Sequence, residues 1–189
     1  MRQVNPVEIR ICRADIQHRS ELLRLLEQHY RDLSEFTPWL FRIHEPFDYP
    51  ALPSYWTEPD RHPFLFRVAE RLAGFALVQQ RSHLSGSPGI NDIAEFFVLR
   101  EYRRRGIGRS AAHAVFQAFP GTWEVRVREC NTIGLSFWEN TVETFTQSGA
   151  RELRHEEDSS IWRVFVFESP RCFSQLHGLA ERLSRGQHV

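Results

Sequence analysis

The sequence predicts one α/β domain in which helices pack on both faces of a mixed, mostly antiparallel sheet. Three observations lead to this fold class. Helical and strand-like periodicities alternate along most of the 189 residues. Segments 64–69 and 74–80 are rich in β-forming residues and lie four residues apart, which favours an antiparallel hairpin and excludes a purely doubly wound sheet. The hydrophobic fraction of 41% supplies enough apolar side chains for a core.

The first third of the chain is expected to run strand, helix and long loop. Residues 8–12 read as a short strand, and Asp15 is placed to cap an amphipathic helix over 16–33. Prolines and aromatic residues then alternate over 34–63, which excludes one long helix. A loop of this length and apolar content is often functional, and a short helix within 51–56 fits its pattern.

Strands and helices alternate in the rest of the chain. After the hairpin and a glycine-rich loop at 82–89, a strand over 92–99 leads into a helix that opens with Gly106 and Gly108 and stops at Pro120. The remaining expected elements are a half-buried strand over 123–127, a helix over 131–145, strands over 149–157 and 160–168, and a weak helix or tail over 170–189.

Composition limits the class of protein. Basic and acidic residues balance at 24 each, which argues against a bulk electrostatic grip on nucleic acid. Cys12, Cys130 and Cys172 form no Cys-x-x-Cys pair, so free thiols in a reducing cytoplasm are expected. The N-terminal residues lack an apolar run of signal-peptide length, and no stretch reaches membrane-span length. We therefore expect a soluble cytoplasmic protein without nucleic-acid or membrane partners.

The most informative stretch is the turn between the strand over 92–99 and the following helix. Its sequence is Arg103-Arg104-Arg105-Gly106-Ile107-Gly108-Arg109. The start of a helix leaves backbone N–H groups without partners and is partly positive. Glycines let a large anion approach those amides, and neighbouring arginines add charge and directed donors. The pattern predicts a phosphate or pyrophosphate site.

Three other interpretations of this turn compete. Gly106-x-Gly108-x-x-Ala111 loosely matches a dinucleotide fingerprint, but that fingerprint needs its first glycine directly after an apolar strand, and 102–105 intervene. A P-loop is excluded because no Gly-Lys-Ser/Thr follows. The arginines alone also suit a nucleic-acid patch or a solvated face, whereas the strand before them and the glycine-opened helix after them favour the anion site.

With these residues the segment resembles the acetyl-CoA signature of the GNAT superfamily of N-acetyltransferases, Arg/Gln-x-x-Gly-x-Gly/Ala between the fourth strand and the third helix. Arg103, Gly106 and Gly108 occupy the signature positions. The order of elements also resembles the family from about residue 7 to 168. The resemblance implies a GNAT domain over 1–169, followed by a C-terminal helix or tail over 170–189, and direct transfer of an acetyl group from acetyl-CoA to an amine.

The resemblance also implies where acetyl-CoA binds. Its pantetheine arm would follow the backbone of the strand that ends at Leu99, which in the family splays from the next strand. A main-chain N–H near Val98 would stabilise the thioester oxygen as it gains charge. The pyrophosphate would lie on the amides of 104–109. The residues assigned to this site are Phe97, Val98, Leu99, Arg103, Arg104, Arg105, Gly106, Ile107, Gly108, Arg109, Asn131 and Trp138.

The acid–base groups follow from the same resemblance. Glu95 lies close to where family members often carry a glutamate and is the first candidate for the base that deprotonates the amine; Asp92 is the second. Glu95 could equally point to solvent or pair with an arginine. The tyrosine that many members use as the acid, seven residues after an asparagine, is Trp138 here, counted from Asn131. Indole cannot serve as an acid, so another group acts or the thiolate takes its proton from water.

Other features leave the acceptor open. The aromatic loop over 36–56 is the best candidate for the acceptor wall, although it could simply pack over the sheet. The nine histidines show no tight ligand pair, so no metal is expected. The acceptor is expected to be a small primary amine of unknown identity, and a homodimer is compatible with the family. The alternative function is a CoA-binding sensor or interaction module with little or no catalysis, which the tryptophan at 138 keeps open.

Overall fold

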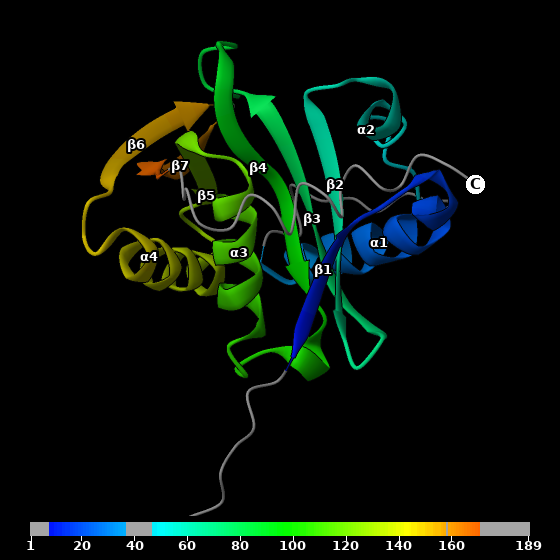
Figure 1. The fold of residues 1–189 in the computed structure, drawn as a ribbon. Coiled ribbons are helices and arrows are strands. Elements are labelled where there is room, and N and C mark those ends of the chain that lie inside the picture. The colour runs from blue at the N-terminus through cyan, green and yellow to red at the C-terminus, as the bar shows by residue number, and fades with distance from the viewer. Residues whose placement is uncertain (1–7, 37–46, 158, 171–189) are drawn as a thin grey trace, which may run out of the picture.

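The computed structural model describes residues 8–36, 47–157 and 159–170, which form a seven-stranded sheet with helices on both faces (Figure 1). The strand order is β1-β2-β3-β4-β5-β7-β6, and all neighbours are antiparallel except the parallel pair β4 and β5. The strands are β1 (Ile9–Arg13), β2 (Arg61–Val68), β3 (Arg71–Arg81), β4 (Pro88–Val98), β5 (Gly121–Arg128), β6 (Arg151–Glu157) and β7 (Ser160–Ser169). The helices are α1 (Arg19–Phe36), α2 (Ser54–Thr57), α3 (Ile107–Ala118) and α4 (Thr132–Thr146), with 3₁₀ turns η1 (Ile16–His18) and η2 (Arg100–Tyr102).

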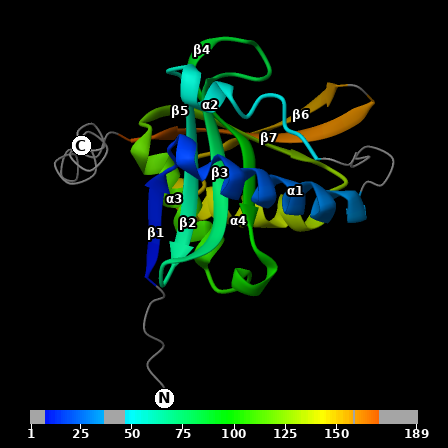
Figure 2. The ribbon, with the colours of Figure 1, turned by 90° about the vertical axis from the view of Figure 1, so that its right-hand side faces the viewer.

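The sheet separates two hydrophobic cores. On one face, α1 and α2 pack over β2, β3 and β4 around Leu22, Leu26 and Phe75. On the other face, α3 and α4 pack around Phe116 and Trp123. Figure 2 shows α1 crossing in front of the strands, with α3 and α4 behind them. The predicted mixed, mostly antiparallel sheet with helices on both faces is confirmed.

The α1 helix begins at Arg19, three residues later than predicted, because residues 16–18 form the turn η1; it carries polar groups toward the sheet. Asp15 caps the preceding turn η1 by accepting a hydrogen bond from Gln17 N at 2.9 Å. Leu22 and Leu26 are fully buried, and each contributes about 1.5–3 kcal/mol through apolar burial. His29 and Tyr30 follow one turn later on the same apolar face, so two polar side chains lie between the helix and β4.

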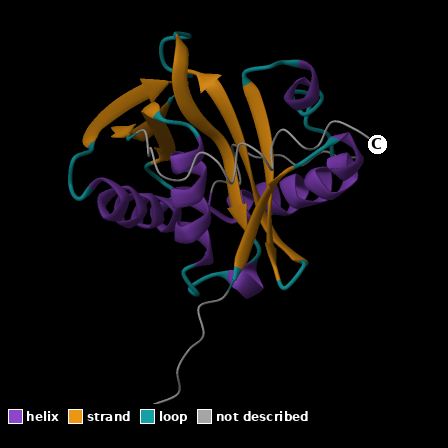
Figure 3. Ribbon diagram, viewed as in Figure 1, coloured by secondary structure: helices purple, strands orange, loops and turns teal. Residues whose placement is uncertain are grey.

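The parallel strands β4 and β5 pair only at their beginnings. The register joins Asn91 to Trp123 and Asp92 to Glu124, and no further pair follows among the described residues. The two strands therefore separate after Asp92 and Glu124. Figure 3 shows the strands of the sheet together with the helices that pack against it. The backbone of β4 also bulges, because Leu77 faces Glu95 whereas Val78 faces Ile93, which leaves Ala94 as an extra residue. The predicted splay between these strands is therefore present.

Two expectations were wrong in detail. The hairpin between β2 and β3 turns at Ala69 and Glu70, both with positive φ, and is tighter than the predicted connection of 70–73. Its β3 strand consequently starts at Arg71. The strand β5 was expected to be half-buried with a polar face toward solvent, yet Glu124 on that face is only 8% exposed. The hydrogen bond that it accepts from Ser82 Oγ at 2.7 Å provides a partner for the buried carboxyl group.

The limits of the described residues leave some expectations open. The predicted tail lies outside them from residue 171 onward, as do 37–46 of the aromatic loop. None of the helices that the structure describes combines the length and the apolar character needed to cross a membrane.

Candidate active site

The end of β4 directs one amide into the gap beside β5. Leu99 N donates to Ala73 O of β3 at 2.9 Å, and Val98 pairs with Gly74 in the antiparallel register. Backbone groups alternate sides along an antiparallel strand, so the N–H and C=O of Val98 point away from β3. They face the region where β5 no longer pairs with β4. By the same alternation, the backbone groups of Phe97 and Leu99 face β3.

The glycine turn presents a second set of amides. Gly106 is the N-cap of α3, with φ +76° and no side-chain cap, so the first amides of the helix have no side-chain acceptor. A Cβ at Gly106 would meet nothing within 4 Å, which leaves this side of the turn open. Arg104, Arg105 and Arg109 are exposed around it. This arrangement fits a polyphosphate, because charge and free donors converge on one open surface.

The second signature glycine lies where the helix meets the gap. A Cβ at Gly108 would be 3.1 Å from the ring of Phe137 on α4 and 3.4 Å from Val98 Cγ2. Ile107 beside it is buried in the core and anchors the first turn of α3. Glycine is needed here because α3, α4 and the end of β4 approach closely.

Arg103 lies differently from its neighbours. Its Nε donates to Val98 O at 2.7 Å, and its Nη2 contacts Asp32 of α1. The guanidinium also lies 5.3 Å from the ring centroid of Phe97. The side chain of Arg103 therefore turns back onto the end of β4, and its place in the phosphate site stays a prediction.

Glu95 lies on the α1 face of the sheet and is held by three donors. Tyr30 Oη donates to its Oε1 at 2.9 Å and Tyr49 Oη to the same atom at 3.3 Å, while His29 Nε2 lies 3.0 Å from Oε2. The Glu95 side chain is only 14% exposed. Burial, followed by the charge of Glu95, raises the pKa values of Tyr30 and Tyr49 well above the ordinary range. Both phenols therefore stay protonated and act as donors to the carboxylate.

Asp92 is placed in a different environment. It is fully buried and accepts hydrogen bonds from Arg126 of β5, at 2.9 Å from Nε and 3.3 Å from Nη2. Burial raises the pKa of this carboxyl above its usual value, and the ion pair with Arg126 offsets only part of the effect. Asp92 thus joins β4 to β5 immediately before the strands diverge.

The two predicted residues of α4 have structural contacts. Asn131 is the N-cap of the helix, and its Oδ1 accepts from Gly134 N at 2.9 Å. Trp138 is 7% exposed and packs edge-on against Phe96, with ring centroids 5.0 Å apart. The indole therefore fills the core behind β4, and the position offers no ionisable hydroxyl near the gap.

The sequence reasoning missed four residues around this site: His29, Tyr30 and Asp32 on α1, and the specific role of Tyr49. The signal for His29 and Tyr30 was present, since both are polar groups on an otherwise apolar helix face. Tyr49 belongs to the aromatic loop predicted to wall the acceptor site, and within its described part Tyr49 reaches Glu95 whereas Tyr55 packs in the core. No sequence pattern singles out Asp32.

Comparison with known proteins agrees with this geometry. A sequence profile described as the Acetyltransferase (GNAT) family matches residues 20–142, which span α1 to α4 and include both sides of the β4–β5 gap. The chain belongs to the GNAT acetyltransferase family. The residues matched include the glycine turn, and the sheet has the GNAT fold. No curated protein matches the sequence significantly.

Solved GNAT structures share the fold at low sequence identity. A probable acetyltransferase from Staphylococcus epidermidis superposes with a TM-score of 0.62 at 10% identity, covering 86% of this chain and 100% of the other. The ribosomal-protein-S18-alanine N-acetyltransferase from Escherichia coli gives 0.58 at 14%, covering 89% and 99%. Spermidine N-acetyltransferase from Vibrio cholerae, in complex with CoA and spermine, gives 0.60 at 10%, covering 85% and 95%. At these identities the likeness extends to the fold alone.

Proposed function

We propose that this GNAT protein is an N-acetyltransferase that moves an acetyl group from acetyl-CoA directly to a primary amine. The observation that carries the proposal is the position of the Val98 N–H. It points into the β4–β5 gap, while Glu95 lies on the adjacent acceptor face of the same strand. A donor for developing negative charge and a carboxylate for an amine proton are thus offered from one strand end.

The acyl donor would be held by the chain in two places. The amides of 104–109, with Arg104, Arg105 and Arg109 around them, suit the pyrophosphate. The outward-facing backbone groups at the end of β4 suit the pantetheine amides. Acetyl-CoA would supply the acetyl group as a thioester, a carbonyl already activated by a good leaving group. The Val98 N–H would donate to the carbonyl oxygen as its negative charge develops.

Glu95 is the base we propose. A primary ammonium must lose a proton before its nitrogen can attack, and Glu95 would take that proton directly or through one water. The contacts with His29, Tyr30 and Tyr49 orient the carboxyl group of Glu95. Asp92, the second candidate, is fully buried and paired with Arg126, so its contribution in this proposal is to hold β4 against β5.

The leaving thiolate would be protonated by water. In the overall step a nitrogen–carbon bond forms and the carbon–sulfur bond breaks. From the ammonium, nitrogen loses one proton to Glu95 before the attack and a second to solvent as the adduct collapses to the amide. Sulfur takes one proton from solvent, so one proton is released overall once Glu95 has passed its own to water. Trp138 has no acidic hydroxyl to supply it and is buried in the core. A thiol with a pKa of about 8.5 leaves tolerably without an acid.

A second candidate keeps the fold and loses the chemistry. A CoA-binding sensor would need the glycine turn but no acid, and the buried indole of Trp138 at the usual tyrosine position favours it. Slow release of CoA thiol with every amine tested would support this alternative.

The acceptor and the setting of the reaction are proposals as well. Two structural neighbours are named as acetyltransferases of spermidine and of an alanine of ribosomal protein S18, so we take a polyamine and an N-terminal alanine as candidate acceptors. A cytoplasmic location follows from the free thiols expected in the sequence and from the acetyl-CoA requirement. The absence of nucleic-acid and membrane partners, and a homodimer, remain predictions from composition and family resemblance.

The test is an amine screen with purified full-length protein. Spermidine, free lysine and a peptide beginning with alanine would each be incubated with acetyl-CoA. Thiol release would be followed by absorbance and the acetylated product by mass spectrometry. We expect amine-dependent thiol release with at least one primary amine. Binding of acetyl-CoA without turnover of any primary amine in a wider panel would favour the sensor, and absence of binding would refute both.

A further inference from the structure

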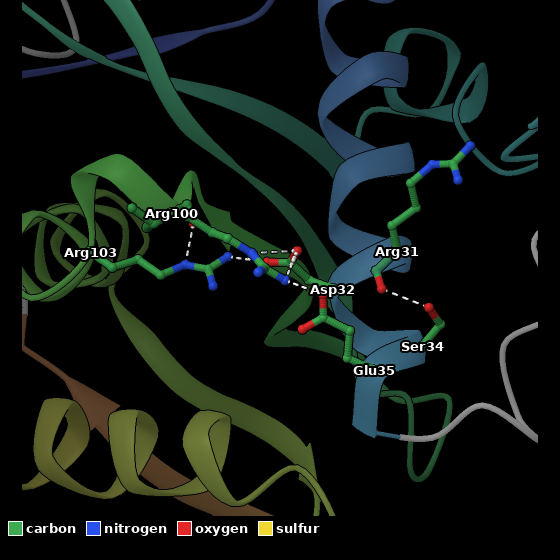
Figure 4. Close-up of polar contacts among 7 residues, drawn as sticks. Arg31, Asp32, Ser34, Glu35, Arg100 and Arg103 are labelled. Carbon is green, nitrogen blue, oxygen red and sulfur yellow. Dashed lines mark hydrogen bonds and ion pairs between the residues drawn. The ribbon is translucent and has the colours of Figure 1, made fainter.

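Asp32, near the end of α1, joins that helix to the end of β4. Its Oδ1 accepts from Arg100 Nε at 3.0 Å and from Arg100 Nη2 at 2.8 Å, and its Oδ2 contacts Arg103 Nη2 (Figure 4). Burial would raise the pKa of Asp32, but the hydrogen bonds from Arg100 and Arg103 outweigh it and hold that pKa below its ordinary value. Asp32 is therefore a carboxylate at neutral pH and faces two guanidinium groups.

Arg103 bridges Asp32 and the end of strand β4. The same guanidinium that contacts Asp32 donates through Nε to Val98 O at 2.7 Å. The Val98 carbonyl and amide point to the same side of β4, into the gap beside β5. Fixing the carbonyl restrains the orientation of the Val98 backbone, which carries the N–H aimed at the gap. Arginine suits this bridge because its planar fork donates in two directions at once.

We propose that Asp32 is a positioning residue for acetyl transfer: it holds Arg103 on the Val98 carbonyl and so keeps the Val98 N–H aimed at the thioester oxygen. This inference rests on the proposed function. Without the carboxylate, the Arg103 side chain, which is 38% exposed, would be free to leave Val98 for other rotamers or for the phosphates on the neighbouring turn. The end of β4 would then lose a restraint beside the reacting carbonyl.

The α1 helix would thereby position two groups of the proposed reaction, the Glu95 carboxyl and the Val98 N–H. His29 lies three residues before Asp32, so the two share a helix face, and His29 contacts Glu95 at 3.0 Å. One rigid helix thus positions the base on the acceptor side and the amide donor on the acyl side. Misplacing such groups lowers the rate of the chemical step more than it lowers affinity. The signature of this role is a fall in kcat with an unchanged dissociation constant for acetyl-CoA.

The test compares Asp32→Asn with a matched control, Glu35→Gln. Glu35 accepts only from Arg100 among the contacts of this cluster, at 2.5 Å, and does not contact Arg103. With an amine that the wild type acetylates in the screen above, we expect Asp32→Asn to lower kcat about tenfold or more. The calorimetric dissociation constant for acetyl-CoA should change less than about twofold, and Glu35→Gln should retain wild-type kcat.

Arg103→Lys gives an independent arm, because a single ammonium cannot reproduce the fork between Val98 and Asp32. It should lower kcat by a similar factor, and the double variant Asp32→Asn/Arg103→Lys should be no slower than the slower single variant. Arg103→Lys also keeps the test decisive should Asp32→Asn fail to fold. In the unliganded protein, hydrogen exchange of peptides covering 97–108 should be faster in both single variants.

The outcomes separate the inference from the function on which it rests. Wild-type turnover of an amine tests the function. Wild-type kcat in Asp32→Asn, or multiplicative losses in the double variant, would overturn the positioning role while leaving the function intact. A change in acetyl-CoA affinity alone that disappears at high salt would identify a purely electrostatic effect and overturn it too. If the wild type acetylates no amine, unchanged hydrogen exchange in Asp32→Asn would still refute the restraint.

Discussion

Replacing Glu95 by glutamine should convert the reaction into one that depends on pre-formed free amine. The variant keeps the size of the side chain and an acceptor oxygen for the tyrosines, but it loses the charge that Tyr30, Tyr49 and His29 surround. A lysine-type amine has a pKa of about 10.4, so at pH about 7.4 roughly one molecule in 1,000 carries a free nitrogen lone pair. That deficit corresponds to about 4 kcal/mol at 1.36 kcal/mol per unit, and the base that we propose would offset it.

We therefore expect Glu95→Gln to lower kcat/KM by about 10²–10³ at pH about 7.4, within the range found for general-base removal. Its rate should climb about tenfold per pH unit toward the pKa of the amine, whereas the wild-type profile should be flatter. The assay is thiol release at saturating acetyl-CoA over pH about 6.5 to 10. Acetyl-CoA affinity should stay unchanged, because the carboxylate lies on the acceptor face.

Glu124→Gln is the matched control. Glu124 is a buried carboxylate on the neighbouring strand that accepts from Ser82 and has no role in the proposed reaction. Equal rates per folded molecule in the wild type and Glu124→Gln, with loss only in Glu95→Gln, would support the assignment. Parallel pH–rate profiles for Glu95→Gln and the wild type, or more than about a tenth of wild-type activity at neutral pH, would refute Glu95 as the base.

Three further outcomes are expected. Gly106→Ala should still fold, because an added Cβ would meet nothing within 4 Å, but its unfolding free energy should fall by about 1–2 kcal/mol, because φ is +76° at this position. Unchanged stability in chemical denaturation would contradict a left-handed turn. Arg126→Met should lower the free energy of unfolding by about 3–5 kcal/mol, because it leaves the Asp92 carboxyl buried without its partner, and the double variant Asp92→Asn/Arg126→Met should recover most of that loss. Equal losses in the single and the double variant would argue against the buried pair. Burial lowers the pKa of His62, so the stability that the neutral ring contributes is present above about pH 6.5 and is lost as pH falls through the lower folded pKa. The unfolding free energy, measured by urea denaturation at several pH values, should therefore fall less steeply with decreasing pH in His62→Phe than in the wild type; the same pH dependence in both proteins would exclude this burial effect.

The fold was predictable because local patterns coincide with the tertiary arrangement. The helix after Asp15, the glycine-opened α3 and the alternating strand β5 each carry a periodicity that only one element type satisfies. The tight β2–β3 turn was not, because Ala69 and Glu70 adopt positive φ without the glycine or asparagine that usually marks such turns.

The acyl-donor half of the site was more predictable than the acceptor half. The amides at Gly106 follow from a contiguous motif, and the gap after Asp92 is what the family resemblance implies. The surroundings of Glu95 depend on α1, which lies more than sixty residues earlier in the chain, and no local pattern pairs His29 with it. Asp32 and Arg103 are similarly far apart in the sequence, so no local pattern predicts that the Arg103 side chain contacts α1 and Val98 O; its role as a phosphate ligand stays a prediction.

The burial of Glu124 and Arg126 shows a second limit of sequence patterns. Alternation correctly places them opposite Trp123 and Val125, but it does not reveal that the polar face of β5 is covered. Their partners, Ser82 and Asp92, come from the β3–β4 connection and from β4. The hydrogen bond from Ser82 makes the burial of Glu124 tolerable, and the ion pair with Asp92 does the same for Arg126.

The most direct test of the account is calorimetric titration of acetyl-CoA into the wild type and into Gly108→Trp. A Cβ at Gly108 would already lie 3.1 Å from the Phe137 ring and 3.4 Å from Val98 Cγ2, so an indole there must displace these side chains at the end of β4. We predict wild-type binding in the range of about 1 μM to 1 mM, which is usual for enzyme substrates, and its loss in the folded variant. Absence of wild-type binding, or equal binding by both proteins, would contradict an acetyl-CoA site at the glycine turn and the end of β4.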